Sequence, residues 1–336
     1  MRILVTGATG FVGRRLVAAL LRRGDRVRAL GRNPDACTAL AADGAEVMRA
    51  DLRDRDAANA ACDGMDVVCH VGALSAPWGR SADFHAINVG GTEHVLAGCR
   101  RHGVGRMVYV SSPSVVFDGT DHRDLTEDAP YPQHLMSVYS LTKKLGEDRV
   151  RAAAATGLAT VIVRPKAVFG PGDVSLLPRL LAAGRQGRLP QVGHGRNLVD
   201  LTYVDNVVHA LILALTAEAA VGETYTITNG EHVALWDLIK TVLRRQGIDA
   251  NLRRLPYRVV YALAGMMELR ATLFGGEPLL TRYTAAILAK TQTYDITAAR
   301  RDLGYEPVVS VAEGVERTLA DLGSGPAHPT EQTKRR

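Results

Sequence analysis

The chain has 336 residues, of which 46% are hydrophobic, and it carries a formal net charge of +6. This length suffices for one large α/β domain with a smaller lobe, and the apolar content supports a full core. Because the arginines are scattered rather than gathered with aromatic residues into one stripe, the positive charge does not predict binding to nucleic acid.

The cysteines and histidines predict neither disulfides nor a metal site. The four cysteines, Cys37, Cys62, Cys69 and Cys99, form no CxxC pair, and no secretory signal precedes the first predicted strand. A reduced, cytoplasmic location is therefore expected. The ten histidines show no HExxH or comparable spacing, so we expect no metal ligands among them.

The first predicted strand, residues 2–6, runs directly into a glycine-rich turn and a helix. Gly7 permits the tight turn, Gly10 lets the backbone approach a pyrophosphate, and Gly13 allows the helix to pack closely on the sheet. A glycine pattern alone is weak evidence, but strand, turn and helix together predict a dinucleotide site at the helix N-terminus. The predicted contacts in this turn are Gly7, Thr9, Gly10, Phe11, Val12 and Gly13.

The second predicted strand, residues 25–30, ends at the position that distinguishes the two nicotinamide cofactors. An acidic residue there binds the ribose of NAD, whereas an arginine binds the 2'-phosphate of NADP. Arg32 follows this strand, with Arg28 or Arg14 to assist, so NADP(H) is favoured over NAD(H). The alternative is that Arg32 is an ordinary surface arginine. Asp35, the nearest carboxylate, follows a proline and is predicted to cap the next helix.

The next two predicted strands supply further cofactor contacts. Residues 47–52 form a strand whose terminal carboxylate, Asp51, is predicted to accept a hydrogen bond from the adenine amino group, with Leu52 beside it. A helix cap is the alternative role for Asp51. After the strand at residues 65–70, the small residue Ala73 would let the cofactor lie close to the sheet.

A helix over residues 88–101 and a strand over residues 105–112 follow. Asn88 is a polar residue on an otherwise packed helix, which is equally typical of a hydrogen-bonded core amide. The strand ends in two hydroxyls, Ser111 and Ser112. Because ligands bind at the carboxyl ends of parallel strands, the position of these serines indicates a site as much as their chemistry does.

Tyr139 and Lys143 are four residues apart and therefore lie on the same side of a predicted helix. A lysine ammonium beside a phenol stabilises the phenolate, so we expect a lowered pKa for Tyr139 and a proton exchange at a carbonyl. By itself such a pair is more typical of a solvated helix face, and the glycine turn and serine strand end favour a reductase site. With a further strand at residues 159–164, the alternating pattern predicts a doubly wound parallel α/β sheet.

These motifs resemble the extended short-chain dehydrogenases/reductases, more narrowly the 3β-hydroxysteroid dehydrogenase branch with its sterol-4-carboxylate dehydrogenases and bacterial 2-alkyl-3-oxoalkanoate reductases. The matching segments are residues 6–13, 111–119, 139–143, 164–172, 202–206, 277–282 and 302–307. The resemblance implies a Rossmann domain, residues 1–165 and about 196–230, and a substrate lobe, about 166–195 and 231–322. Residues 323–336 are predicted to be a disordered tail. A homodimer through the Asn88 and Tyr139 helices is also implied.

Carried over to this chain, the resemblance implies that Tyr139 is the general acid/base and that Lys143 is its electrostatic and ribose-binding partner. Ser112 would hold the substrate oxygen, with Ser111 and Ser114 as possible substitutes. Asn88 would be a support residue. Pro165 and Val168 would contact the cofactor. Lys166, where related chains vary, would contact a substrate carboxylate or face solvent.

The carboxyl-terminal part indicates the substrate class. Residues 256–267 and 271–274 are unusually apolar, but Glu268 and Arg270 shorten the stretch below the length of a membrane span. It is predicted to be a buried lobe helix or a cover over a long-chain or polycyclic substrate, with shallow membrane contact as a further role. We therefore expect an NADP(H)-dependent oxidoreductase acting on a hydrophobic 3-oxo or 3-hydroxy acid or a steroid-like alcohol. The alternatives are a nucleotide-sugar epimerase or dehydratase and a non-catalytic dinucleotide sensor.

Overall fold

The computed structural model describes residues 1–173 and 176–324, and a seven-stranded sheet is its centre. The strands run in the order β12-β7-β5-β4-β1-β2-β3, and every neighbouring pair is parallel. The predicted doubly wound α/β class is confirmed. Strand order reverses between β1 and β4, which is where such sheets bind their ligands. The strands are β1 (Arg2–Thr6), β2 (Arg26–Gly31), β3 (Glu46–Arg49), β4 (Val67–His70), β5 (Arg106–Val110), β7 (Ala159–Pro165) and β12 (Thr224–Ile227).

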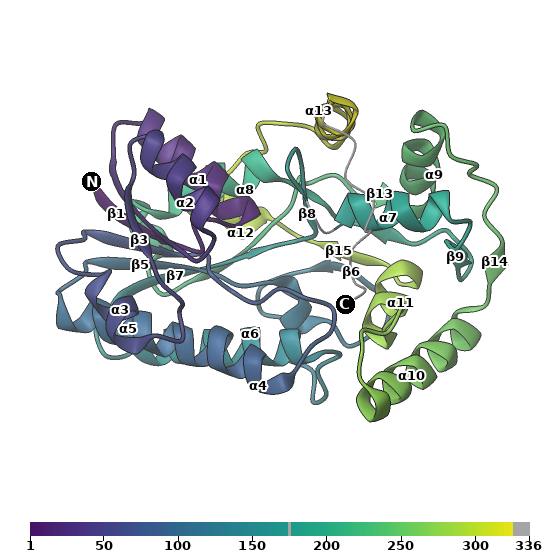
Figure 1. The fold of residues 1–336 in the computed structure, drawn as a ribbon, viewed down its shortest axis with the longest axis horizontal. Helices are drawn as coiled ribbons and strands as arrows, with labels where there is room; N and C mark the ends of the chain where they lie inside the picture. The colour runs from purple at the N-terminus through teal and green to yellow at the C-terminus, as the bar shows by residue number, and fades with distance from the viewer. Residues whose placement is uncertain (174–175, 325–336) are drawn as a thin grey trace, which may run out of the picture.

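Helices cover both faces of this sheet (Figure 1). One face carries α1 (Phe11–Arg22), α2 (Pro34–Ala42), α8 (Val204–Ala214) and α12 (Thr297–Leu303). The other face carries α3 (Arg55–Ala60), α4 (Ser81–Phe84), α5 (Gly91–Arg101) and α6 (Val138–Ala154). The sheet is therefore buried on both sides, as its nearly continuous apolar strands require.

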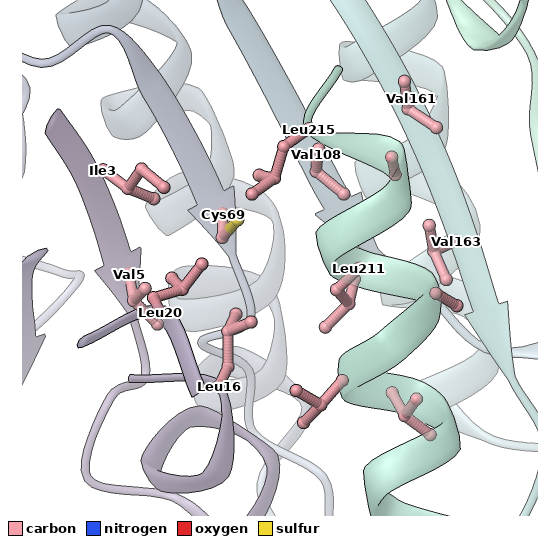
Figure 2. Packing of buried hydrophobic residues seen from close by; sticks show 14 of the residues in the cluster. Ile3, Val5, Leu16, Leu20, Cys69, Val108, Val161, Val163, Leu211 and Leu215 are labelled. Carbon is pink, nitrogen blue, oxygen red and sulfur yellow. The ribbon is translucent and has the colours of Figure 1, made fainter. Parts of the chain in front are cut away.

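Alternation along the strands divides the core into two clusters. Ile3 and Val5 face α1, where Leu16 and Leu20 pack on them (Figure 2). Leu4, between them in the sequence, belongs to the cluster on the opposite face. Each of these side chains is fully buried. Burial of one such side chain contributes roughly 1.5–3 kcal/mol, so this packing holds α1, and with it the glycine turn, on the sheet.

The remaining elements gather at one end of the sheet, to the right in Figure 1. A four-stranded sheet runs β13-β10-β15-β6, and two short parallel pairs, β11-β8 and β14-β9, flank it. The division into two lobes at the predicted boundaries stays a prediction. The strands are β6 (His122–Leu125), β8 (Val168–Phe169), β9 (Gln191–Val192), β10 (Leu198–Val199), β11 (Thr202–Tyr203), β13 (Val233–Ala234), β14 (Arg254–Leu255) and β15 (Gln292–Tyr294), and the helices are α7 (Leu176–Arg185), α9 (Leu235–Arg245), α10 (Tyr257–Phe274), α11 (Arg282–Ala289) and α13 (Val311–Ser324).

The predicted tail begins two residues too early, because α13 continues to Ser324. The rest of that tail, residues 325–336, lies outside the described residues.

Helix α10 differs from the prediction of a buried lobe helix that charged residues cut short. It is one continuous helix of 18 residues, and only Val260 and Ala264 are buried. Glu268 does not end it, because its carboxylate accepts hydrogen bonds from the backbone N–H and the Nε of Arg282 at 2.7 and 2.6 Å. Its outer face exposes Val259, Leu263, Met266, Leu269, Leu273 and Phe274. None of the helices described is both long and apolar enough to span a membrane.

Candidate active site

The glycine turn between β1 and α1 leaves no room for side chains. Gly7 has a φ of +66°, and a Cβ there would lie 2.5 Å from the Cα of Gly72, which follows β4. A Cβ on Gly13 would overlap the Gly7 carbonyl oxygen. Gly10 is the N-cap of α1 and offers no side-chain hydrogen bond to the helix. The turn thus forms a bare backbone cradle at a helix N-terminus, which fits the pyrophosphate of a dinucleotide.

The neighbouring predicted cofactor residues surround this cradle. Thr9 packs its side chain against Gly31 at the end of β2, where a Cβ would lie 2.5 Å from Thr9 Cγ2. Phe11 and Val12 begin α1 and pack on the apolar cluster of the carboxyl-terminal elements, so only their backbone N–H groups can serve phosphates. Leu52 is buried beside Gly72, and the half-buried Ala73 follows Gly72 directly.

Charged residues lie at the ends of β2 and β3. Arg32 Nη1 is 3.1 Å from Asp51 Oδ2, and Arg53 Nη2 is 2.9 Å from the same oxygen. Hydrogen bonds from Arg53 and then Arg32 hold the pKa of Asp51 well below its usual range. Arg53 was missed at the sequence level. Arg28 cannot assist, because it pairs with Glu46 at 2.8 Å and donates to carbonyls near the opposite end of the sheet.

The start of α2 corrects the predicted role of Asp35. Asn33 is the N-cap, and its Oδ1 accepts a hydrogen bond from Ala36 N at 2.9 Å. Pro34 occupies the first helical position, so Asp35 falls inside the first turn. The Asn33 cap fixes the chain immediately after Arg32.

Asn88 links two segments of the site by hydrogen bonds. It is buried in a π-helical turn, η1 (His85–Gly90). Its Oδ1 accepts from Leu74 N at 2.7 Å, and its Nδ2 donates to Leu74 O at 3.1 Å and to Thr142 Oγ1 at 3.0 Å. Asn88 therefore joins the loop after β4 to the amino-terminal part of the Tyr139 helix. Its amide is fully engaged, which matches the role of a support residue.

Helix α6 presents Tyr139 and Lys143 on successive turns. Ser137 caps the helix by accepting a hydrogen bond from Ser140 N at 3.1 Å. Lys143 is 2% exposed, and its Nζ donates to Val110 O, the last residue of β5, at 2.6 Å. Burial lowers the pKa of Lys143 to about 7, although the carboxylate of Glu147 opposes this shift.

The pKa of Tyr139 is raised, which corrects the expectation of a lowered value. Burial is the largest cause, and interactions with the hydroxyls of Ser75 and Ser112 oppose it. The Lys143 ammonium is not among the groups that lower this pKa, and its Nζ donates a hydrogen bond to the Val110 carbonyl. At neutral pH the phenol thus holds its proton and can donate it.

Among the three candidate serines, Ser112 is the one whose hydroxyl interacts with Tyr139. Its Oγ also accepts a hydrogen bond from Ser114 N at 3.2 Å, which begins the turn η2 (Pro113–Val116). Ser111 interacts with Glu147 instead. Ser114 faces the hydroxyl of Tyr283, although its Oγ has no partner within normal hydrogen-bond geometry.

Two residues near Tyr139 were missed at the sequence level. Ser75 lies in the loop after β4, and Tyr283 lies in the first turn of α11. Tyr283 is close enough to Tyr139 to affect its charge state and meets Phe117 edge to face at 6.3 Å. Neither residue has a spacing that relates it to Tyr139. The only signal was that Tyr283 directly follows the matching segment at residues 277–282.

Comparison with known proteins decides the family. Residues 4–257 match the 3-beta hydroxysteroid dehydrogenase/isomerase family. The chain belongs to this family. It is 40% identical to a 2-alkyl-3-oxoalkanoate reductase of Stenotrophomonas maltophilia, covering 95% of this chain and 99% of that protein. It is 33% identical to the decarboxylating sterol-4-alpha-carboxylate 3-dehydrogenase of Mus musculus, covering 94% and 89%.

A solved dTDP-glucose 4,6-dehydratase of Streptomyces venezuelae with NAD bound superimposes with a TM-score of 0.77 at 26% identity, covering 96% of this chain and 97% of that one. This 3-beta hydroxysteroid dehydrogenase family member is therefore a nicotinamide dinucleotide-dependent oxidoreductase with a Rossmann-like fold.

Lys166, the residue after Pro165, is buried in this family member, so the alternative prediction that it faces solvent was wrong. Lys166 is 9% exposed, and its Nζ donates to Gln292 Oε1 at 2.7 Å. Pro165 ends β7 and Val168 begins β8, which places both beside the carboxyl end of the main sheet. Among the residues that the structure describes, no cluster of three or more His, Cys, Asp or Glu side chains could hold a metal ion.

Proposed function

We propose that this protein is an NADP(H)-dependent ketoreductase and alcohol dehydrogenase acting on a hydrophobic 3-oxo or 3-hydroxy acid, or on a steroid-like alcohol. The observation that carries the proposal is the Tyr139 phenol, whose pKa is raised by burial, next to the Ser112 hydroxyl and one helical turn from the buried Lys143. These groups lie at the carboxyl end of the sheet, on the same edge as the glycine cradle.

In the reductive direction Tyr139 gives its proton to the oxygen of the ketone, and the Ser112 hydroxyl donates a hydrogen bond to the same oxygen as negative charge develops there. The hydride comes from the reduced nicotinamide when it is bound. Lys143 stabilises the phenolate left on Tyr139. In the oxidative direction the same phenolate removes the alcohol proton.

The choice of NADP(H) rests on the charges around the adenosine end. Two guanidinium groups, Arg32 and Arg53, flank the single carboxylate of Asp51. A 2'-phosphate would gain two charge-assisted partners there, in exchange for the hydrogen bonds that both guanidinium groups donate to the oxygens of Asp51. Arg32 is 61% exposed and is free to turn toward a phosphate.

The choice of a hydrophobic substrate rests on the surroundings of Tyr139. The aromatic rings of Tyr283 and Phe117 lie on the side of the site formed by α11 and η2. The names of the relatives from Stenotrophomonas maltophilia and Mus musculus, an oxoalkanoate reductase and a sterol dehydrogenase, support the same class.

The test is turnover of a substrate panel by the purified protein with NADPH and, separately, NADH. We expect NADPH consumption with a 2-alkyl-3-oxoalkanoate or a steroid ketone, and slower consumption with NADH. UDP-sugars are assayed by chromatography of the sugar nucleotide, because an epimerase would consume no net cofactor. Conversion of sugar nucleotides alone would favour the epimerase alternative, and cofactor binding without turnover of any class would favour the sensor.

A further inference from the structure

The carboxyl end of β7 lies beside the catalytic serine. Strands β5 and β7 are parallel, with Val110 opposite Val163. Ser112 follows the end of β5 by two residues, and Pro165, two residues after Val163, ends β7. Neighbouring strands are about 4.8 Å apart, so Lys166 follows directly next to the end of β5 that carries Ser112.

Lys166 is buried among polar groups that use only part of its hydrogen-bonding capacity. Its one hydrogen bond among the described residues goes to Gln292 Oε1 on β15, and Nζ lies 5.4 Å from the centre of the Tyr294 ring. An ammonium has three donor hydrogens, so two remain for another acceptor. Burial is the main reason that the pKa of Lys166 falls to about 8, and a bound anion would restore its charge.

Further donors around Lys166 also lack acceptors. Gln292 Nε2 and the Tyr294 hydroxyl are buried without a hydrogen-bond partner among the described residues. On the Tyr139 side, Tyr294 is close to Tyr283, which is in turn close to Tyr139. Unsatisfied buried donors are costly, and several of them next to one ammonium indicate that a polar acceptor belongs there.

The neighbouring acidic residue does not already satisfy Lys166. Asp200 is fully buried, but its Oδ1 accepts from His232 Nδ1 at 2.6 Å and its Oδ2 accepts from Tyr294 N at 2.7 Å. No ion pair joins Asp200 to Lys166 within the described part of the chain, and His232 also pairs with Asp124 at 3.1 Å on its outer side. Asp200 therefore acts on Lys166 only through space, because its two oxygens accept hydrogen bonds from His232 and the Tyr294 N–H, and the donor hydrogens of Lys166 are left for another acceptor.

We propose that Lys166, with the Gln292 amide and the Tyr294 hydroxyl, binds the carboxylate of the substrate whose ketone or alcohol reacts at Tyr139. This inference rests on the proposed function and narrows it. A carboxylate held on β7 and a carbonyl held by Ser112 on the adjacent strand fit a 3-oxo or 3-hydroxy acid. Polar groups built to bind a substrate anion discriminate strongly against an analogue that lacks it.

The experiment compares two alcohols in the oxidative direction with NADP, because 3-hydroxy acids are chemically stable. One is a 2-alkyl-3-hydroxyalkanoate, and the other is the secondary alcohol of the same chain without the carboxylate. Wild type is compared with Lys166→Met, with the charge-retaining Lys166→Arg, and with Lys290→Met as a control. Lys290 lies two residues from Gln292 but pairs with Asp121 at 3.1 Å. Isothermal titration of the hydroxy acid into the NADPH complex measures binding separately from turnover.

We expect Lys166→Met to lower kcat/KM for the hydroxy acid about 100-fold and to weaken its binding similarly, with the plain alcohol changed less than about threefold. Lys166→Arg should recover most of the loss, and Lys290→Met should behave as wild type. If Lys166→Met proves unstable in thermal melting, Gln292→Leu replaces it and should give a smaller loss confined to the acid.

Two results would overturn the inference. One is an equal loss for acid and plain alcohol in the Lys166→Met variant, which would make Lys166 a structural residue. The other is wild-type enzyme that oxidises both substrates equally well, in which case the proposed function stands and the carboxylate site does not. Wild-type enzyme that oxidises and binds neither substrate also overturns this inference, and the turnover of a steroid alcohol by the same enzyme then decides whether the proposed function stands.

Discussion

At the scale of single residues, Tyr139, the proposed general acid, is held in the protonation state that a reductase needs. Burial raises the pKa of Tyr139, so the phenol remains protonated at neutral pH. Lys143, with its pKa near 7, is poised between its charged and neutral forms. The ammonium therefore matters most once Tyr139 has given up its proton, when it faces a phenolate instead of a neutral phenol.

Replacing Tyr139 with phenylalanine removes this proton donor and leaves the packing in place. We expect kcat to fall about 10²–10⁴-fold in both directions, the usual contribution of a general acid, with an unchanged dissociation constant for NADPH. Stopped-flow turnover and fluorescence titration measure the two quantities. Tyr261→Phe on α10 is the control and should keep wild-type kcat. A Tyr139→Phe enzyme with near wild-type kcat would contradict the assignment.

Replacing Arg32 with alanine tests the choice of cofactor. Loss of one charge-assisted contact to the 2'-phosphate should raise the dissociation constant of NADPH about tenfold, while that of NADH changes less than about twofold. Arg26→Ala is the control, because Arg26 is exposed at the opposite end of the same strand. If both cofactors bind the Arg32→Ala protein as tightly as wild type, Arg32 is only a surface arginine.

At the scale of elements, the contact between the glycine turn and α1 decides whether the cradle forms. In Gly13→Ala the new methyl group would overlap the Gly7 carbonyl and lie 2.8 Å from Ala8 Cα. The backbone must shift, so we expect a loss of about 1–3 kcal/mol in the free energy of unfolding and NADPH binding weakened at least about tenfold. Urea denaturation and cofactor titration check both effects.

The matched control for Gly13→Ala is Gly265→Ala, which also adds a methyl group within a helix. There the nearest atom, Arg282 Cδ, is 3.5 Å away, so the methyl group fits. Alanine has the higher helix propensity, and we expect this variant to be about as stable as wild type or slightly more stable. Equal destabilisation of the two variants would mean that the turn does not depend on close packing at Gly13.

Elements whose signals are local could be predicted from the sequence. β1 occupies the predicted residues, and Gly7 adopts the positive φ that the tight turn requires. The Tyr139 helix and the serine strand end also lie where the pattern placed them. Each depends on neighbouring residues only, through glycine geometry, hydrophobic periodicity and the order of strand, turn and helix.

Features that depend on distant contacts could not be predicted. Tyr283 and Gln292 come to the site through the packing of the carboxyl-terminal elements, and no spacing relates them to Tyr139 or Lys166. The pKa of Tyr139 was predicted in the wrong direction, because spacing on a helix does not reveal how strongly the surrounding fold desolvates the phenol. For a similar reason the sequence left open whether α10 is buried or exposed. The apolar composition predicts that this helix packs against another apolar surface, but it does not show whether this chain supplies that surface.

At the scale of the whole molecule, the burial of two lysines in the site lowers the free energy of unfolding. Lys143 and Lys166 enter the junction between the main sheet and the carboxyl-terminal elements, and burial lowers their pKa values to about 7 and about 8. An unfolded chain keeps both lysines protonated up to their ordinary values near 10.5. The folded protein therefore binds fewer protons than the unfolded chain over this range.

Burial of these two lysines should make the free energy of unfolding rise with pH. The free energy of unfolding rises with pH wherever the unfolded chain binds more protons than the folded protein. The stability that is lost by burying the lysines is therefore lost in full below pH 7, and this loss declines toward pH 10.5. Between pH 7 and 9.5, the free energy of unfolding of wild type should increase by on the order of 2 kcal/mol or more relative to that of Lys143→Met, because the variant has lost one of the two buried lysines.

Urea denaturation of the cofactor-free proteins at several pH values measures this difference, and titrations common to both proteins cancel. Lys144→Met is the control, because Lys144 pairs with Asp148 at 2.8 Å near the surface, and its pH profile should parallel wild type. Parallel profiles for wild type and Lys143→Met would show instead that Lys143 keeps its ordinary pKa in the folded protein.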